Sequence, residues 1–312
     1  MDYAHKWTDT KLKAFEKEIA KQYKQPVKNA KKKLDAFLNK FKAEDRQKRL
    51  QVKSGKLTEK QYKDWKIEYI VMSVGFLKLI EELSADFHTA NKAVMSLTVD
   101  FSKEIYAENY NYGTYEVEKG LLIDTDYELY NASDAEPENQ KSNMTTKDTE
   151  WNKQQMQSVM IGFISVGVAS DILSRKFANE MGRKNVTTAI RAVERIVTSA
   201  ENSARADSYA RAEKLGVSNI QQEWVATLDG KTRHTHRMLD GMRVRVGEPF
   251  EVEGYTIRYP CDPEADPEMV CNCRCTLVCE TNLASFVTNE HIKEKIDIAG
   301  MSYNEWKALK VK

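Results

Sequence analysis

All five cysteines of this 312-residue chain lie within one short stretch. They are Cys261, Cys271, Cys273, Cys275 and Cys279, and the 260 residues before them contain no cysteine. Cysteines of an ordinary apolar core would be scattered, so sulfur at this density requires a local reason. The choices are a metal site, disulfide bonds or close packing of small core residues.

The compartment expected from the sequence narrows these choices. The first twenty residues are charged throughout and contain no apolar segment of a secretory signal. The longest apolar run, near residues 159–169, is shorter than the ~20 residues that span a bilayer, so we expect no membrane segment. A reducing cytosol disfavours stable disulfides, which leaves metal binding or packing as the main interpretations.

Helical periodicity dominates the chain before the cysteines. Apolar residues at three- and four-residue spacing predict helix over 2–50, with Pro26 opening a second helix. Thr58 followed by Gln61 predicts a capping box at the start of the next helix. We expect a second helical block from about 150 to Gly216, interrupted at 181–185. Gly162 and Gly167 are interpreted as sites of close approach.

Charge is unevenly distributed along the chain. Residues 1–70 contain 20 Lys and Arg against 10 Asp and Glu, a net charge of +10, and the remainder carries 28 against 37, a net charge of −9. A basic arm favours an anionic partner such as nucleic acid, although a solvated helical face explains it equally well. The candidate DNA contacts at the predicted helix start are Lys28, Lys31, Lys32 and Lys33.

The pattern changes from helical to alternating after residue 222. Short strands are predicted over 224–228, 242–246, 255–259 and 271–278, with a short helix over 232–239 and a turn at Asp240 and Gly241. The fold class is therefore mainly α, with a long helical N-terminal region followed by a small α+β C-terminal domain. We divide the chain into a helical basic region, a linker, a helical block, the α+β domain and a helical tail, over 1–130, 131–149, 150–220, 221–282 and 283–312.

The alternating segment contains an ordered set of polar and aromatic residues. In chain order they are Trp224, Asp229, Thr232, Arg233, His236, Asp240, Gly241, Asp262, Asn272, Cys273, Arg274 and Cys275. This pattern, over about 55 residues, resembles the C-terminal domain of the Mu F-like minor head proteins of tailed phages, also called the SPP1-type head morphogenesis family. The chain departs from the usual pattern at Cys261, where a small residue such as Gly is usual, and at Cys271, where an aliphatic residue is usual.

The resemblance implies a minor head protein of a tailed bacteriophage. Such proteins associate with the portal or the capsid interior, in low copy number, and act in head assembly, DNA packaging or ejection. The implied partners are the phage portal protein, the major capsid protein or both. The basic arm, and not the resemblance, adds non-specific contact to double-stranded DNA as an expectation. The implied location is the virion, preceded by the host cytoplasm during assembly, and no enzymatic activity is expected.

The clustered residues also suggest a structural zinc ion. On a strand, Cys271, Cys273 and Cys275 would project from one face within reach of one tetrahedral ion. We hypothesise that zinc is held by Cys273, Cys275, His236 and one of Cys261, Cys271 and Cys279. Close packing of the cysteines as small core residues is the competing interpretation.

Asp229 and Arg233 are expected to fix the short helix to the sheet. Asp229 would cap the helix, and Arg233 would pair with Asp240 or Asp262. Two other functions stay open at this point. One is a zinc-containing nucleic-acid-binding protein with a basic helical arm; the other is an enzyme with His236 as base, Asp229 orienting it and Cys273 as nucleophile. No phosphate-binding loop, H-E-x-x-H or G-x-S-x-G motif supports the enzyme.

Overall fold

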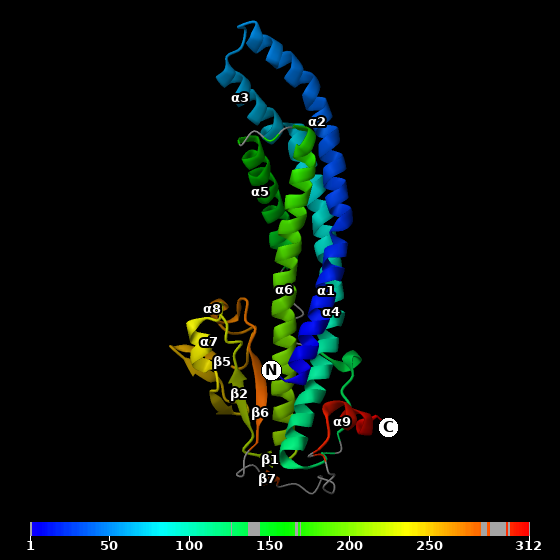
Figure 1. Ribbon diagram of the computed structural model, residues 1–312, viewed down its shortest axis with the longest axis vertical. Helices are drawn as coiled ribbons and strands as arrows, with labels where there is room; N and C mark the ends of the chain where they lie inside the picture. Colours follow the sequence, from blue (N-terminus) through cyan, green and yellow to red (C-terminus); the bar gives the residue numbers. More distant parts are fainter. Residues whose placement is uncertain are drawn as a thin grey trace. The chain divides into compact units, whose positions relative to one another are not determined.

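The computed structural model describes residues 2–125, 127–136, 144–165, 168, 170–281, 286–287, 298 and 300–311. The chain forms two compact units. Unit 1 contains residues 1–15, 97–142 and 191–312, and unit 2 contains residues 16–96 and 143–190. The predicted mainly α fold with a small α+β part is confirmed (Figure 1). No helix among these described residues is both long and apolar enough to cross a membrane.

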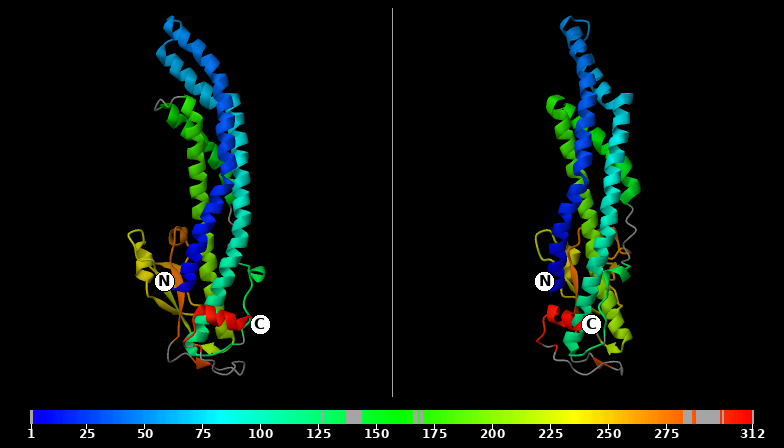
Figure 2. Two further views of the ribbon diagram at one scale, coloured as in Figure 1. Left: turned by 45° about the vertical axis from the view of Figure 1, so that its right-hand side comes forward. Right: turned by 90° about the vertical axis from the view of Figure 1, so that its right-hand side faces the viewer.

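Unit 2 is built from helices alone in the residues described. Figures 1 and 2 show α2 and α3 as a hairpin whose tip projects beyond the other helices of this unit. The predicted capping box is confirmed, because Thr58 and Gln61 satisfy each other's backbone N–H groups at the start of α3. The helices contributing to this unit are α1 (Tyr3–Gln22), α2 (Lys24–Lys53), α3 (Glu59–Ile67), the π-helical turn η1 (Glu68–Met72), α4 (Val74–Leu121), α5 (Met144–Ser165) and α6 (Ser170–Lys214).

Two glycine predictions in unit 2 are wrong. The predicted break at 181–185 is absent, because α6 runs unbroken through it. Gly182 allows helix packing instead: a Cβ at this position would lie 2.4 Å from a methyl carbon of Val27 on α2. A Cβ added at Gly162 would have no described atom outside its own helix turn within 4 Å, so no close approach occurs there, while Gly167 lies outside the described residues.

Unit 1 joins the C-terminal halves of α4 and α6 to the first turns of α1 and to the C-terminal helix α9 (Tyr303–Lys310). Aromatic rings hold α9 in place: Tyr303 packs on Tyr112 and Tyr115, and Trp306 donates its indole N–H to Glu118 at 2.7 Å. Trp306 of this helix is buried, whereas Leu309 is exposed.

The small α+β part of unit 1 follows Gly216, whose φ of +94° ends α6 as predicted. Its main sheet has the order β3-β2-β6 and is antiparallel, with Trp224 opposite Leu277. The strands are β1 (Val217–Ser218), β2 (Gln221–Val225), β3 (Arg243–Arg245), β4 (Phe250–Val252), β5 (Tyr255–Ile257), β6 (Thr276–Glu280) and β7 (Phe286–Val287). The short helices are α7 (His234–Leu239) and α8 (Pro267–Val270), and residues 132–134 form a 3-10 turn.

The predicted strand over 271–278 is only half correct. Strand β6 begins at Thr276, and the three preceding cysteines lie in the turn that follows α8. Asn272 has a φ of +54°, which an extended strand does not allow. Cys271 is consequently exposed while Cys273 and Cys275 are buried, so the three thiols do not share one face.

Candidate metal centre

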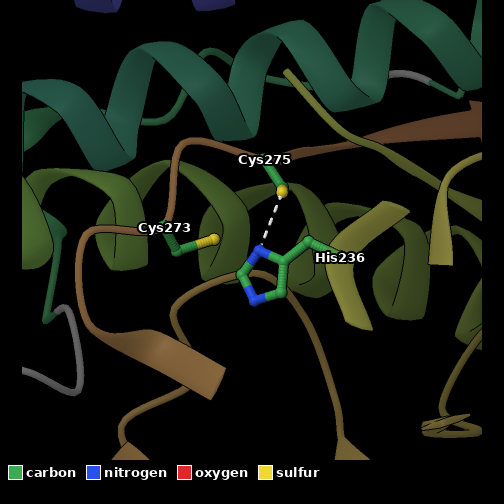
Figure 3. Close-up of side chains that lie close together, drawn as sticks. All are labelled: His236, Cys273 and Cys275. Carbon is green, nitrogen blue, oxygen red and sulfur yellow. Dashed lines mark hydrogen bonds between the residues drawn. The ribbon is translucent and has the colours of Figure 1, made fainter. Parts of the chain in front are cut away.

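The buried histidine and two of the buried cysteines meet inside the α+β part. His236 comes from α7, and Cys273 and Cys275 come from the turn before β6 (Figure 3). One nitrogen of His236 and the sulfur atoms of both cysteines all lie within 4.8 Å of one another. The ligand atoms around a tetrahedral zinc ion lie roughly 3.5–3.8 Å apart, from bonds of about 2.0–2.3 Å. This group therefore has the donors and the spacing for one metal ion.

The His236 ring is oriented by a backbone carbonyl. Its Nε2 lies 2.9 Å from the carbonyl oxygen of Met269, which accepts a hydrogen bond only from a protonated Nε2. Nδ1 then keeps its lone pair, and this atom lies 3.3 Å from the sulfur of Cys275. Histidines that bind metals commonly donate their other ring N–H to such a carbonyl. The ring is thus fixed in the tautomer that a metal ion needs.

Cys261 lies beside this group and has an unusual backbone. Its buried thiol donates to the carbonyl of Val270 at 3.3 Å, and it also hydrogen-bonds with Cys273. Its φ is +62°, a region that costs a residue with a Cβ atom about 1–2 kcal/mol. Glycine would fit this position without that cost.

The surroundings of Cys273 and Cys275 favour the protonated form of both thiols in the metal-free protein. The hydrogen bond with Cys261, together with burial, raises the pKa of Cys273. The hydrogen bond with Cys273, together with burial, raises the pKa of Cys275, although His236 acts in the opposite direction. A metal ion bound here would displace both protons, as thiolate ligation requires.

Cys271 and Cys279 lie outside this group. Cys271 is exposed, and its carbonyl accepts a hydrogen bond from the Arg233 guanidinium. Cys279 is half-buried on β6 and packs against a second apolar cluster that contains Tyr209 and Val246. All five cysteines are free thiols, so the residues described contain no disulfide.

The other residues of the motif hold the loops around the sheet. Asp229 does not cap α7 as predicted, since the capping position is Arg233 and no side chain caps it. Asp229 forms a bidentate pair with Arg274, at 2.7 and 2.8 Å. That pair, with the backbone N–H of Lys231, lowers the pKa of Asp229. Because Asp229 is occupied in this way and the His236 ring bonds to Met269, the catalytic arrangement with Asp229 orienting His236 is wrong.

The remaining motif positions have structural contacts that spacing did not reveal. Arg233 pairs with neither Asp240 nor Asp262, contrary to the prediction. Asp240 accepts from the backbone N–H of Ala226 at 2.8 Å, and Asp262 pairs with Arg258 at 2.6 Å. The further contacts are Thr232 to the carbonyl of Thr227, Gly241 N–H to the carbonyl of Trp224 at a φ of +75°, and the Trp224 ring edge-on to His236.

Helix α6 fastens the sheet with residues that the sequence did not indicate. Asn202 donates to the carbonyl of Cys275 and accepts from the N–H of Leu277. Arg205 is fully buried and donates to the carbonyl of Leu277 at 2.7 Å and to both carboxylate oxygens of Asp2. In the sequence, these contacts could be suspected only because Asn202 and Arg205 are polar residues within a predicted helix. That signal does not reveal which residues they contact.

The four predicted DNA-contacting lysines are unequal. Lys31 pairs with Asp35 at 2.7 Å, and Lys33 is half-buried between Asp86 and Glu82. Lys28 and Lys32 are exposed, with no ion pair to any residue that the structure describes.

These features define a mainly helical protein whose small α+β part carries a buried cluster of one histidine and two cysteines. Residues 152–278 match the family model described as Phage Mu protein F like protein. The resemblance recognised from the motif is confirmed over that region, which covers less than half of the chain. The match begins about seventy residues before the motif, so it includes much of α5 and all of α6.

One curated relative shares a segment of this chain. The NAD(+)–arginine ADP-ribosyltransferase EFV of Enterococcus faecalis is 36% identical over 104 residues. The shared segment covers 33% of this chain and 21% of that protein, so the chain spans about a fifth of its relative's length. No solved structure matches the chain.

Proposed function

We propose that this chain is a minor head protein that docks at the portal and capsid interior of a tailed phage and is packaged with the DNA. The observation that carries the proposal is the family match over 152–278, since the family is one of phage head morphogenesis. Its location is then the virion, preceded by the host cytoplasm during assembly. The role is structural, because the motif residues described above bond to one another and to backbone groups.

Co-expression with the portal and major capsid proteins of the same phage tests this role. We expect the chain to co-elute with assembled portal rings in size-exclusion chromatography. Elution apart from both the portal and the capsid protein would contradict the proposal. Consumption of NAD(+) by the purified chain would also contradict it, because the proposed role is structural and not enzymatic.

We further propose that the buried cluster holds one structural zinc ion through His236, Cys273, Cys275 and Cys261. The oriented His236 ring and the strained backbone of Cys261 support these four residues over Cys271 and Cys279. Zinc would join α7 to the turn before β6 and thereby fix the centre of the α+β part.

Elemental analysis of protein purified without chelators tests the zinc proposal. We expect about one zinc per chain in the wild type, and the same in the matched control variants Cys271→Ser and Cys279→Ser. Cys273→Ser and Cys275→Ser should lose most of it. Less than about 0.2 zinc per wild-type chain, or equal losses in all four variants, would refute the site.

A further inference from the structure

A basic stripe runs along α2 and is interrupted at Asp35 and Asn39. Positions on one side of a helix recur every three or four residues, and nine such positions can be followed from the first turn of α2 to its last. Seven of the nine are basic. The nine are Lys24, Lys28, Lys31, Asp35, Asn39, Lys42, Arg46, Arg49 and Lys53.

The acidic groups near the stripe neutralise only part of it. Asp35 is taken by Lys31 and by the Ser174 hydroxyl, and Asp45 is taken by Arg49. The other five basic residues of the stripe form no ion pair with a residue that the structure describes, and all five are exposed. They are Lys24, Lys28, Lys42, Arg46 and Lys53.

The hairpin that carries the outer half of the stripe is internally braced. The Phe41 ring stacks on Trp65 at 5.5 Å, and Trp65 stacks on Tyr62 at 6.1 Å. The Tyr62 hydroxyl donates to Asp45 at 2.6 Å, and the Lys48 ammonium lies 5.6 Å from the centre of the Trp65 ring. These contacts keep α2 and α3 together, so the positive charge is presented on a preformed surface rather than on a flexible tail.

The tip of the hairpin adds to this charge. Residues 40–66 contain 10 Lys and Arg against 4 Asp and Glu, a net charge of +6. Among them Lys56, Lys60 and Lys63 are exposed. With a net charge of +6 on 27 residues, the positive side chains repel one another. Binding of a polyanion would relieve this repulsion by neutralising part of the positive charge.

We propose that this basic stripe, with the tip of the α2–α3 hairpin, binds the phosphate backbone of double-stranded DNA without sequence preference. The distance along α2 from Lys28 to Lys53 is about 38 Å at 1.5 Å per residue, similar to one turn of the duplex, about 34–36 Å. Proteins that bind single strands stack bases on accessible aromatic rings. The rings of this hairpin are packed on one another instead, which favours a duplex recognised by its backbone.

The lysines expected from the sequence to contact DNA are only partly available. Lys31 and Lys33 are already paired, so the contact moves towards Lys42, Arg46 and Lys53 at the outer end of α2. It concerns the isolated chain, and therefore it can fail or succeed independently of whether the protein enters phage heads.

Fluorescence anisotropy with a 30-base-pair duplex of arbitrary sequence tests the proposal on the full chain. With about five phosphates contacted, the affinity should fall roughly 500-fold between 50 and 200 mM salt. The triple variant Lys42→Gln, Arg46→Gln, Lys53→Gln should lose at least about tenfold in affinity and should reduce the slope of log affinity against log salt by about 2.7.

A matched control replaces two exposed lysines and one exposed arginine elsewhere: Lys92→Gln, Arg191→Gln and Lys231→Gln. The control should bind like the wild type, and unchanged circular dichroism should show that both triple variants are folded. Equal losses in the two triple variants, or no loss in the stripe variant, would overturn the proposal. Tighter binding to poly-glutamate than to the duplex would also overturn it, since the partner would then be an acidic protein.

Discussion

Replacing Asp2 by Asn should destabilise the protein, because this carboxylate compensates a fully buried arginine. Arg205 has no exposed surface, and its side chain donates to both oxygens of Asp2, at 2.8 and 2.9 Å. Asn109 accepts from its Nε, and Glu201 lies 3.7 Å away. Removing one partner of a buried ion pair leaves the other charge uncompensated, which is the costly case.

The magnitude follows from the pKa of Asp2. Burial by itself would raise this pKa, but the charge and hydrogen bonds of Arg205 outweigh burial and lower it from 3.8 to about 2. At about 1.4 kcal/mol per pKa unit, the folded state gains about 2 kcal/mol from the ionised carboxylate. This contribution is fully present above the unfolded pKa of about 4, and it is lost as the pH falls through 2.

Urea unfolding of the wild type and of Asp2→Asn measures this contribution. At pH 7 we expect the variant to lose about 2 kcal/mol of unfolding free energy, and the difference should shrink as the pH is lowered below 4. Asp64→Asn, at an exposed carboxylate on α3, is the control and should stay within about 0.5 kcal/mol. A loss below about 0.5 kcal/mol for Asp2→Asn, or a loss that does not depend on pH, would refute the reasoning.

Two further predictions use other contacts of the same structure. Burial alone would lower the pKa of His5, but the hydrogen bond to Glu201 at 2.6 Å outweighs burial, so the pKa is raised in the folded protein. Stability should therefore decline as the pH rises above 6.5 through the folded pKa of His5. The variant His5→Gln should abolish that decline in unfolding measurements. Gly182→Ala should lower the melting temperature because its Cβ would meet Val27, whereas Gly162→Ala, in open space within a helix, should stabilise by about 0.5–1 kcal/mol. Equal melting temperatures for the two alanine variants would contradict the packing argument.

Local signals in the sequence predicted local structure well. The capping box at Thr58 and the helix end at Gly216 each depend on a few adjacent residues, and both are observed. The same local logic made the Gly182 region appear to be a break. Helix α6 tolerates this glycine because it packs against Val27, more than 150 residues earlier in the chain, and a single sequence does not reveal that contact.

In the candidate site, too, residue types could be predicted from the sequence, whereas backbone geometry and long-range contacts could not. The cluster of His236, Cys273 and Cys275 could be anticipated from residue type and from the family motif, and the structure brings these three together. The strand argument behind that expectation was nevertheless wrong, because the positive φ of Asn272 turns the chain before β6 begins. The Asp2–Arg205 contact spans 203 residues and carries no sequence signal.

The central claim is that the chain is a component of the phage head, and quantitative mass spectrometry of purified particles tests it most directly. The measurement compares DNA-filled heads and empty procapsids of a phage that carries this gene, with the portal protein as the internal standard for copy number. The account predicts peptides from this chain in the particles at a few to a few tens of copies, cross-linked to the portal. Absence of the chain from both filled heads and procapsids would contradict it.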